Sequence, residues 1–505
     1  MTAELVGDDP LLLGIDIGTS GVKGVLCAPG GRVVASHRIA IAVSRPRPGW
    51  AEHDPQSDWW DSVCKVIREL LNGCSHAGKR IAGIGVSGVC PVVLPVDSSD
   101  EPVRRAILYS IDRRAVAELE ELAAYFDHGD VLARAGQPLG TQNIVAKLLW
   151  LRKYEPEVWS RTRHVLGSTG FVVARLTGVH TVDHFTASDG GLGYMLDARD
   201  WDREVFETAD LPIETMPALT WPTDVVGHVR STVAAELGVR EGTPVVAGTG
   251  DALAELIGAG AATPGDGALL YGTSLSTMVL AGSRSRSPSV VTVPGWRRDQ
   301  LVQSAILPLG SGLLEWWSRF CGETWDELWF TRIDDALRTS PPGARGLLHL
   351  PYLTGTRSRE SIRGALLGMR VDHTEADRVR AVAEGMAHAL RAELDDNETP
   401  VSLRAIGGGA RSTELVQVIS DVCGFEQPLI ELGFGAARGA AWLAARGVGL
   451  HNRDDAQDWT RTTDRILPRV ELAGTYQRQH GRFVAAMRSG IVRVDAIDEA
   501  PSTNC

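Results

Sequence analysis

The amino-acid sequence predicts an α/β protein made of two related halves, and two observations support that prediction. Short apolar runs typical of strands alternate with helical patterns over most of the 505 residues. The strand-like residues 11–16, followed by the turn Gly18-Thr19-Ser20, are echoed half a chain later by residues 269–271 followed by Gly272-Thr273-Ser274. Because each turn follows the same type of strand and precedes a second one, duplicated domains are the better explanation.

The first elements are predicted to be an antiparallel meander and a helix. Residues 11–16, 22–27 and 32–43 are apolar runs separated by glycine turns, a pattern that predicts two or three antiparallel strands. Asp54-Pro55 is a favourable helix start, and apolar residues then recur at helical spacing until Gly73 ends the pattern.

The remaining elements continue the alternation of helices and strands. Residues 81–88 and 91–96 are predicted to be strands, and helical patterns with short strands follow to about residue 246. The echo then predicts a domain boundary near Gly248, with an N-terminal domain over residues 1–247 and a C-terminal domain over residues 248–490. Residues 491–505 are predicted to form a mobile tail.

The composition is that of an ordinary water-soluble protein with an acidic excess. The chain is 44% hydrophobic and has a formal net charge of −12, which argues against a nucleic-acid binder because such domains carry clustered Lys and Arg. It has no run of roughly 18 uncharged apolar residues that would predict a membrane span, and no signal-peptide pattern. Its seven scattered cysteines, without CxxC spacing, predict reduced thiols in the cytoplasm and neither disulfides nor a zinc site.

Two glycine-rich stretches look like nucleotide-binding motifs but lack the required context. Residues 73–80 nearly spell a P-loop, but Arg80 stands where a Mg²⁺-binding Ser or Thr is needed, and the stretch follows a helix instead of a strand. Residues 83–88 match GxGxxG, but a strand continues where a helix should open.

The turn after the first strand is a candidate phosphate site. Backbone N–H groups and hydroxyls of Gly18, Thr19 and Ser20 could hold phosphate oxygens, and Asp16 at the end of the strand could hold hydrated Mg²⁺. The alternative is a hairpin in which the aspartate only caps its own turn. The second turn favours the phosphate site, because two facing hairpins would clamp a triphosphate from both sides.

Two further positions could carry chemistry. Gly407-Gly408-Gly409 follows a strand-like run and opens a helix, leaving a flat backbone surface for a group such as adenine or ribose. Asp251 lies between a strand and a helix, where its structural role is that of an N-cap. Its functional role would be that of a general base, ionised at neutral pH by the helix N-terminus, that accepts a proton during phosphoryl transfer.

Taken together and in this order, these motifs resemble the FGGY family of carbohydrate kinases, within it the xylulokinase-like branch. The similar segments are residues 14–23, 49–55, 147–150, 248–251, 271–274, 364–368 with 384–385, and 407–412. The resemblance implies two actin-like (ribonuclease H-like) domains around a central cleft, with ATP and Mg²⁺ as cofactors. It implies that Asp251 is catalytic, that Asp16 and Asp251 hold the metal, and that the nucleotide is bound by Gly18, Thr19, Ser20, Lys23, Gly272, Thr273, Ser274, Gly407, Gly408, Gly409 and Arg411.

The chain departs from this branch where the sugar would bind. Xylulokinases usually read Gly-Gln-Met-His-Gly where this chain has Val89, Cys90 and Pro91, and the catalytic aspartate is often followed by asparagine where this chain has Ala252. A site that lacks these hydrogen-bonding groups should bind a different pattern of hydroxyls. We expect the substrate to contact Val89, Cys90, Asp112, Arg114 and Asp251, with Asp189 a further candidate.

The sequence therefore predicts a cytoplasmic kinase that phosphorylates a hydroxyl of a small ketose or polyol. Two alternatives stay open: a non-catalytic actin-like protein that binds ATP or senses sugars, and a kinase of a non-sugar hydroxylated signal molecule. No nucleic-acid or membrane partner is expected. A homodimer is compatible with the sequence.

Overall fold

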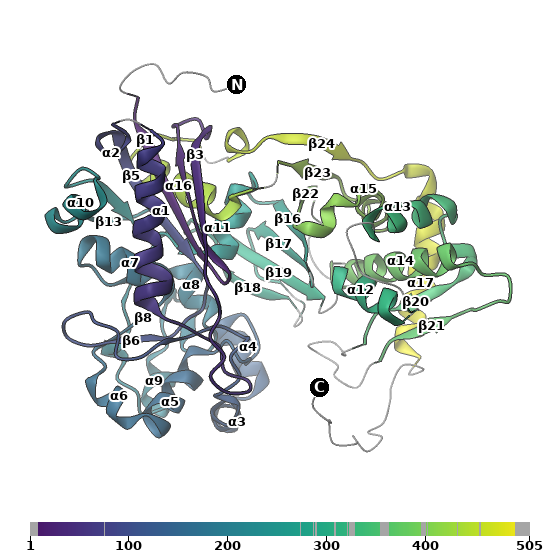
Figure 1. Ribbon diagram of the computed structural model, residues 1–505. Coiled ribbons are helices and arrows are strands. Elements are labelled where there is room, and N and C mark those ends of the chain that lie inside the picture. Colours follow the sequence, from purple (N-terminus) through teal and green to yellow (C-terminus); the bar gives the residue numbers. More distant parts are fainter. Residues whose placement is uncertain are drawn as a thin grey trace.

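The computed structural model describes residues 9–489 except 75, 273, 286, 288–289, 308–309, 321, 323–328, 354–362, 395–399, 401, 432 and 454–455. It contains two seven-stranded sheets, one in each half of the chain, with helices around them (Figure 1). The predicted α/β class is confirmed. The predicted tail, residues 491–505, and Thr273 lie outside the described residues.

The first sheet begins with the predicted meander. Three antiparallel strands are followed by a parallel strand next to the first one, and a short parallel strand and an antiparallel edge strand complete the order. In spatial order they are β3 (Val33–Ala40), β2 (Gly21–Cys27), β1 (Leu11–Gly18), β5 (Ile81–Gly88), β14 (Pro244–Val246) and β13 (Val225–His228), and β15 (Thr249–Gly250) also pairs with β5.

The second sheet repeats this arrangement. Four antiparallel strands, one more than in the first sheet, are followed by two parallel strands and an antiparallel edge strand. In spatial order the strands are β18 (Val291–Pro294), β19 (Leu301–Leu307), β17 (Leu275–Ala281), β16 (Asp266–Tyr271), β22 (Ser402–Ile406), β23 (Gln427–Ile430) and β24 (Thr462–Ile466). The shared order of five core strands supports the duplication inferred from the two Gly-Thr-Ser turns.

The helices and short hairpins fill the space around the sheets. In the first half they are η1 (Pro55–Trp60), α1 (Asp61–Asn72), α2 (Ala77–Arg80), α3 (Val116–Tyr125), α4 (His128–Ala135), α5 (Ile144–Tyr154), α6 (Pro156–Arg161), α7 (Ser168–Thr177), α8 (His184–Asp189), α9 (Arg203–Thr208), η2 (Ile213–Thr215) and α10 (Ser231–Leu237). In the second half they are α11 (Asp251–Gly258), α12 (Ser311–Phe320), α13 (Trp329–Thr339), η3 (Ala344–Gly346), α14 (Glu375–Leu394), η4 (Gly408–Arg411), α15 (Thr413–Cys423), α16 (Gly435–Gly447), η5 (Gln457–Trp459), η6 (Val470–Leu472) and α17 (Ala473–Arg488). Two-stranded pairs are formed by β4 (Glu52–His53) with β7 (Ala106–Ile107), β6 (Leu94–Val96) with β8 (His164–Leu166), β9 (Thr181–Asp183) with β12 (Ala218–Thr220), β10 (Tyr194–Met195) with β11 (Asp200–Trp201), and β20 (Leu348–Leu350) with β21 (Ala365–Leu367).

The first long helix forms for the reasons that the sequence suggests. The Asp54 carboxylate caps it by accepting hydrogen bonds from the amides of Gln56 and Ser57, and Gly73 ends it. Its first turn, η1, is a π-helical turn that leads into α1. The strand predicted over residues 91–96 is shorter than expected, because only β6 forms and Pro91 has no amide hydrogen for a ladder bond.

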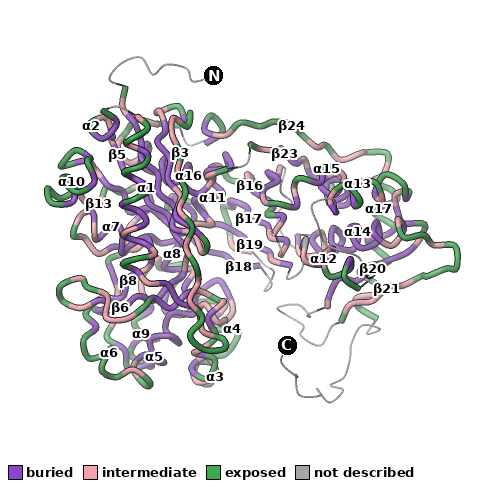
Figure 2. The backbone as a smooth tube through the Cα atoms, in the orientation of Figure 1, coloured by how far each residue is buried: buried purple, intermediate pink, exposed green. Residues whose placement is uncertain are grey.

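Helix α16 comes from the second half of the chain but covers the sheet of the first half. It packs against β1, β5 and α11, and Figure 2 shows this joint between the lobes as buried. A Cβ atom on Gly14 or Gly85 would lie 1.9 Å from a carbonyl oxygen of α16, so glycine is required for this close approach. The two lobes therefore share a core in which side chains of both sheets meet α11 and α16.

The predicted division at residues 247 and 248 stays a prediction. Strand β15, just beyond it, still pairs with the first sheet, whereas β16 belongs to the second. Within the described part of the chain, no helix combines the length and the apolar character that crossing a bilayer requires.

Candidate active site

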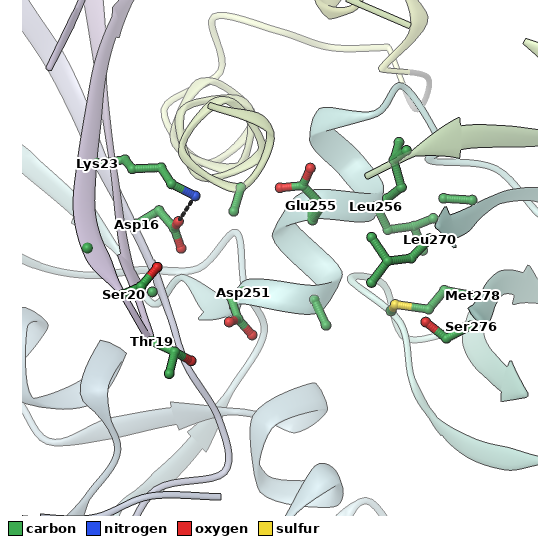
Figure 3. A pocket seen from close by; sticks show the side chains of 16 residues that line it. Asp16, Thr19, Ser20, Lys23, Asp251, Glu255, Leu256, Leu270, Ser276 and Met278 are labelled. Carbon is green, nitrogen blue, oxygen red and sulfur yellow. Dashed lines mark hydrogen bonds and ion pairs between the residues drawn. The ribbon is translucent and has the colours of Figure 1, made fainter. Parts of the chain in front are cut away.

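A cavity of about 320 Å³ lies between the two lobes and collects residues from both (Figure 3). The first lobe contributes the end of β1 and its hairpin turn, and the second contributes β16, β17 and the end of β22. Its lining residues are Asp16, Gly18, Thr19, Ser20, Gly21, Lys23, Asp251, Ala252, Glu255, Leu256, Ala268, Leu270, Ser276, Met278, Ile406 and Ala436. The predicted metal, catalytic and first-turn residues therefore meet in one place.

The position of Asp16 follows from strand register. In the first sheet Asp16 is paired with Lys23 of β2 on one side and with Ser87 of β5 on the other. The Ser87 hydroxyl donates to Asp16 Oδ1 at 3.2 Å, and Lys23 Nζ lies 3.4 Å from Asp16 Oδ2. Burial raises the pKa of Asp16 even though Lys23 lowers it. The carboxylate is thus nearly enclosed, with one cation and one hydroxyl beside it.

Asp251 and Glu255 face the cavity from successive turns of α11. Figure 3 shows both side chains on the cavity side of the helix, opposite Asp16 and Ser20. Burial and then the charge of Asp16 raise the pKa of Asp251 to about 7, and burial and Asp16 also raise the pKa of Glu255. Three carboxyl groups gathered in one partly enclosed cavity repel one another, which favours a cation among them.

Two expectations about Asp251 are corrected by this geometry. Asp251 is the first residue of α11, and Gly250 is the N-cap. The helix N-terminus was expected to keep Asp251 ionised at neutral pH, but burial and the neighbouring carboxylates raise its pKa to about 7. A carboxyl with a pKa near 7 is well matched to proton transfer at neutral pH.

The second Gly-Thr-Ser turn and the glycine-rich loop lie together at one edge of the second sheet. Because β16 and β22 are parallel neighbours, Gly272 and Gly407 follow adjacent strand ends. Gly407 has a φ of +92°, and a Cβ atom there would be 2.8 Å from the Tyr271 carbonyl oxygen. Ser274 accepts a hydrogen bond from the Gly272 amide. None of these three residues lines the cavity, which Leu270 and Ile406 reach from the same strands.

The rest of the glycine-rich loop forms the short helix η4. Gly408 is exposed, with open space where a Cβ would project, and Gly409 is buried. The Arg411 guanidinium lies 5.9 Å from the Phe330 ring centroid and does not reach the cavity. Ser412 caps α15 by accepting a hydrogen bond from the Leu415 amide, as predicted for its structural role.

A second cavity of about 260 Å³ adjoins the first, since Ala252, Leu270, Ser276 and Met278 line both. Its other lining residues are Cys90, Pro91, Tyr109, Ser110, Gln137, Gln142, Phe185, Asp189, Thr277, Val291, Val293, Ser304 and Ile306. The Tyr109 hydroxyl is 3.3 Å from Thr19 Oγ1, which links this cavity to the first turn. Buried Lys147, from the predicted signature segment, positions Tyr109 by donating to the carbonyls of Leu108 and Tyr109.

Of the predicted sugar contacts, the structure brings Cys90 and Asp189 into the second cavity but not Val89, Asp112 or Arg114. Val89 is buried, and its amide donates to the Ile17 carbonyl. The side chains of Arg114 and Asp112 are fully buried, and they form an ion pair with each other at 2.7 Å. These two residues face each other and Glu52, so their partners are within the fold.

Sequence reasoning missed Glu255, Ser87 and Tyr109, among other residues of the site. Glu255 is four residues after Asp251 and therefore on the same face of a helix, a spacing that could have identified it. Ser87 and Tyr109 come close to Asp16 and Thr19 only through strand pairing and tertiary packing, for which a single sequence carries no direct signal.

The first cavity fits a hydrated Mg²⁺ ion held partly by phosphate. In the described part of the chain no three His, Cys, Asp or Glu residues are arranged as a metal cage. Mg²⁺ is commonly bound through one or two carboxylates, waters and substrate phosphates, and the opposed carboxylates of Asp16 and Asp251 supply that donor set.

The sequence matches family models over both lobes. Residues 11–258 match the N-terminal domain, and residues 267–448 the C-terminal domain, of the FGGY family of carbohydrate kinases. The chain belongs to this family. It is a carbohydrate kinase, a phosphotransferase that acts on sugar hydroxyls, and the predicted family resemblance is confirmed.

Individual relatives place the chain among xylulokinase-like members. It is 30% identical to the xylulose kinase of Escherichia coli (strain K12), over 86% of this chain and 89% of that protein. It is 28% identical to the L-xylulose/3-keto-L-gulonate kinase of the same organism, over 95% of this chain and 98% of the relative. The crystal structure of xylulose kinase from Rhodospirillum rubrum has a TM-score of 0.90 at 29% identity, covering 95% and 99% of the two chains. The actin-like two-domain fold is thereby confirmed.

Proposed function

We propose that this kinase uses ATP and Mg²⁺ to phosphorylate a hydroxyl of a small ketose or polyol. FGGY kinases use ATP, and the observation that carries the proposal is the meeting of Asp16 and Asp251 in one cavity. That cavity opens into a second one of a size suited to a small sugar. Phosphate donor and hydroxyl acceptor would thus meet beside Asp251.

Asp251 is the general base in this proposal. It accepts the proton of the substrate hydroxyl while the hydroxyl oxygen bonds to the γ-phosphorus and the bond to the β-phosphate oxygen breaks, releasing ADP. A pKa near 7 supports the role, because a base of that strength is both available and able to take a proton at neutral pH.

The first-lobe hairpin holds the phosphates in this proposal. Gly18, Thr19 and Ser20 present amides and hydroxyls to the cavity, and Lys23 adds a positive charge beside Asp16. Asp16 and Asp251 would hold the metal, which neutralises charge on the phosphates when bound. Gly272, Thr273, Ser274, Gly407, Gly408, Gly409 and Arg411 are proposed to bind the rest of the nucleotide at the neighbouring edge of the second sheet.

D-Xylulose is not the expected best substrate. Cys90, Pro91 and Ala252 face the second cavity where xylulokinases commonly have polar groups, and a lost hydrogen bond to a buried hydroxyl costs about 1–3 kcal/mol. Two such losses correspond to roughly 30- to 10⁴-fold in kcat/KM. The relatives' names support a small ketose in general, and one of them also includes a sugar acid.

A coupled ADP-release screen tests the proposal. The panel contains pentuloses, hexuloses, tetruloses, polyols and sugar acids, each measured as kcat/KM with and without Mg²⁺. We expect sugar-stimulated, Mg²⁺-dependent turnover with D-xylulose ranking below another ketose or polyol. ATP hydrolysis that no compound stimulates would contradict kinase activity on sugars. D-Xylulose ranking first with kcat/KM above about 10⁴ M⁻¹s⁻¹, ordinary for an enzyme on its own substrate, would contradict the specificity prediction alone.

A further inference from the structure

We infer that the second cavity selects uncharged sugars over sugar acids, and that Asp189 is the residue that determines this preference. The inference rests on the proposed function and narrows its substrate class. It follows from the position of Asp189, from the chemistry of the other lining groups, and from the distance over which the Asp189 charge acts.

The position of Asp189 is fixed relative to the catalytic aspartate. Asp189 is the last residue of α8, and the N-cap of α8 is Asp183, whose carboxylate accepts hydrogen bonds from the amides of Phe185 and Thr186. The same carboxylate accepts a hydrogen bond from Thr249 Oγ1 at 2.8 Å. Thr249 belongs to β15, which leads directly into Asp251. Asp183 therefore ties the helix that carries Asp189 to the strand that carries the base.

Asp189 faces the cavity next to Cys90. The Cys90 thiol donates to Asp189 Oδ2 at 3.6 Å, and both residues line the cavity. Burial and the nearby carboxylates raise the pKa of Cys90 well above its usual range, so the thiol stays protonated and remains a donor. At the position where xylulokinases commonly have a polar side chain, this chain therefore has a thiol that orients the Asp189 carboxylate.

The other polar groups among the described residues that line this cavity are neutral. Gln142 donates to Gln137 Oε1, and Gln137 donates to the Ser188 carbonyl, so the two amides form a short hydrogen-bonded row beside Asp189. Among the described residues that line this cavity there is no Lys, Arg or His. Amides, hydroxyls and one carboxylate can donate to and accept from sugar hydroxyls, but they offer no cation to a carboxylate substrate.

The charge of Asp189 also acts beyond its own contacts. The cavity that Asp189 lines also touches Ala252, the residue next to Asp251, so the field of Asp189 reaches the reacting end of the site. A substrate carboxylate placed in the same cavity would be repelled by the Asp189 carboxylate that lines it. At the effective dielectric constant of a partly buried site, such repulsion lowers binding by about 100-fold or more.

The test uses pairs of compounds that differ only in one terminal group: erythritol and erythronate, xylitol and xylonate, and sorbitol and gluconate. For wild-type enzyme we expect kcat/KM for the better polyols to exceed that for the matching acids by about 100-fold or more. Asp189→Asn keeps the shape of the side chain and removes its charge, so the ratio should fall about tenfold or more. Glu207→Gln removes an exposed charge from the same lobe, and the ratio should be unchanged.

The outcomes separate this inference from the proposed function. Wild-type turnover of an acid within tenfold of its polyol, or an unchanged ratio in Asp189→Asn, would overturn the inference while leaving the kinase intact. Absence of turnover with every compound of these pairs and with every ketose of the ADP-release panel would overturn the proposed function. Calorimetric titration of the same pairs then decides the inference: binding of polyols over acids supports it, and equal binding or no binding of either class refutes it.

Discussion

Replacing Asp251 by asparagine should reduce activity and raise stability at the same time. The change keeps the size of the side chain and its place at the start of α11, but removes the proton acceptor. We expect ATP binding to persist while sugar phosphorylation falls about 10²- to 10⁴-fold, the usual contribution of general acid–base catalysis.

The effect on stability follows from the pKa of Asp251. Burial and the charge of Asp16 raise that pKa from 3.8 to about 7, so the folded protein holds the proton more tightly than the unfolded chain. The carboxyl therefore destabilises the fold progressively as pH rises from about 4 to 7, and fully above 7. Each pKa unit corresponds to about 1.4 kcal/mol, which sets an upper bound of about 4 kcal/mol. Water in the cavity reduces this value, and we expect Asp251→Asn to stabilise by about 1–4 kcal/mol at pH 8.

Two measurements check this reasoning. Coupled ADP release at saturating ATP gives the loss of kcat, and thermal unfolding at pH 8 and pH 4.5 gives the change of Tm in the absence of nucleotide. The variant should be more stable than wild type at pH 8, and this difference should shrink at pH 4.5, where the wild-type carboxyl is protonated. Activity within a factor of about three of wild type would refute the general base, and a lower Tm at pH 8 would refute the electrostatic account of the cavity.

Three further predictions concern the metal, the interlobe joint and the buried ion pair. Asp16→Ala should abolish Mg²⁺-dependent turnover with the fold retained, whereas unchanged Mg²⁺ dependence would mean that Asp16 only holds Ser87 and Lys23. Gly85→Ala should lower the free energy of unfolding by about 3 kcal/mol or more, because its Cβ would lie 1.9 Å from the α16 backbone. Gly83→Ala is the control, because the nearest atom to its Cβ would be a Val448 side-chain carbon at 3.0 Å, and it should cost about 1 kcal/mol or less. A denaturant titration measures both values. Arg114→Met should lower the unfolding free energy by about 3–5 kcal/mol, since Asp112 would remain buried without its cation. In that variant KM for the sugar should stay near the wild-type value, exposed Arg113→Met should change neither quantity, and a raised KM with normal stability would restore Arg114 as a substrate contact.

Local patterns were sufficient to predict most of the strands and helices near the site. The runs around Asp16 and Leu269 alternate with glycine turns, and this predicted the first meander and the antiparallel pair of β16 and β17 that echoes it. Asp16 and Asp251 could be identified because each stands where a strand ends, and functional side chains in α/β folds gather at such ends. The helix after Asp54 was predicted from its cap and its apolar spacing, both of which act within a few residues.

Long-range packing accounts for the features that the sequence did not predict. The small residues of α16 indicate close packing, but nothing local tells that its partners are Gly14 and Gly85, several hundred residues earlier. Asp112 and Arg114 have the residue types of a sugar site, and only the tertiary structure shows that they neutralise each other. The raised pKa of Asp251 depends on how close Asp16 and Glu255 come, which is a property of the assembled cavity.

The same joint that escaped prediction fixes the spacing of the reacting groups. The first turn of α16 is contacted from both sides: Ser87 Oγ, which also bonds Asp16, is 3.5 Å from the Ala436 carbonyl, and Glu255 accepts a hydrogen bond from the Ala436 amide. Both Asp16 and the face of α11 that carries Glu255 and Asp251 are thus held in place by contacts with the first turn of α16. We expect domain closure to move Leu270, Ser276 and Met278 toward a carboxylate pair whose spacing these contacts hold constant. The repulsion within that pair then persists in the open enzyme, which is why removal of the Asp251 charge should stabilise the protein even before nucleotide binds.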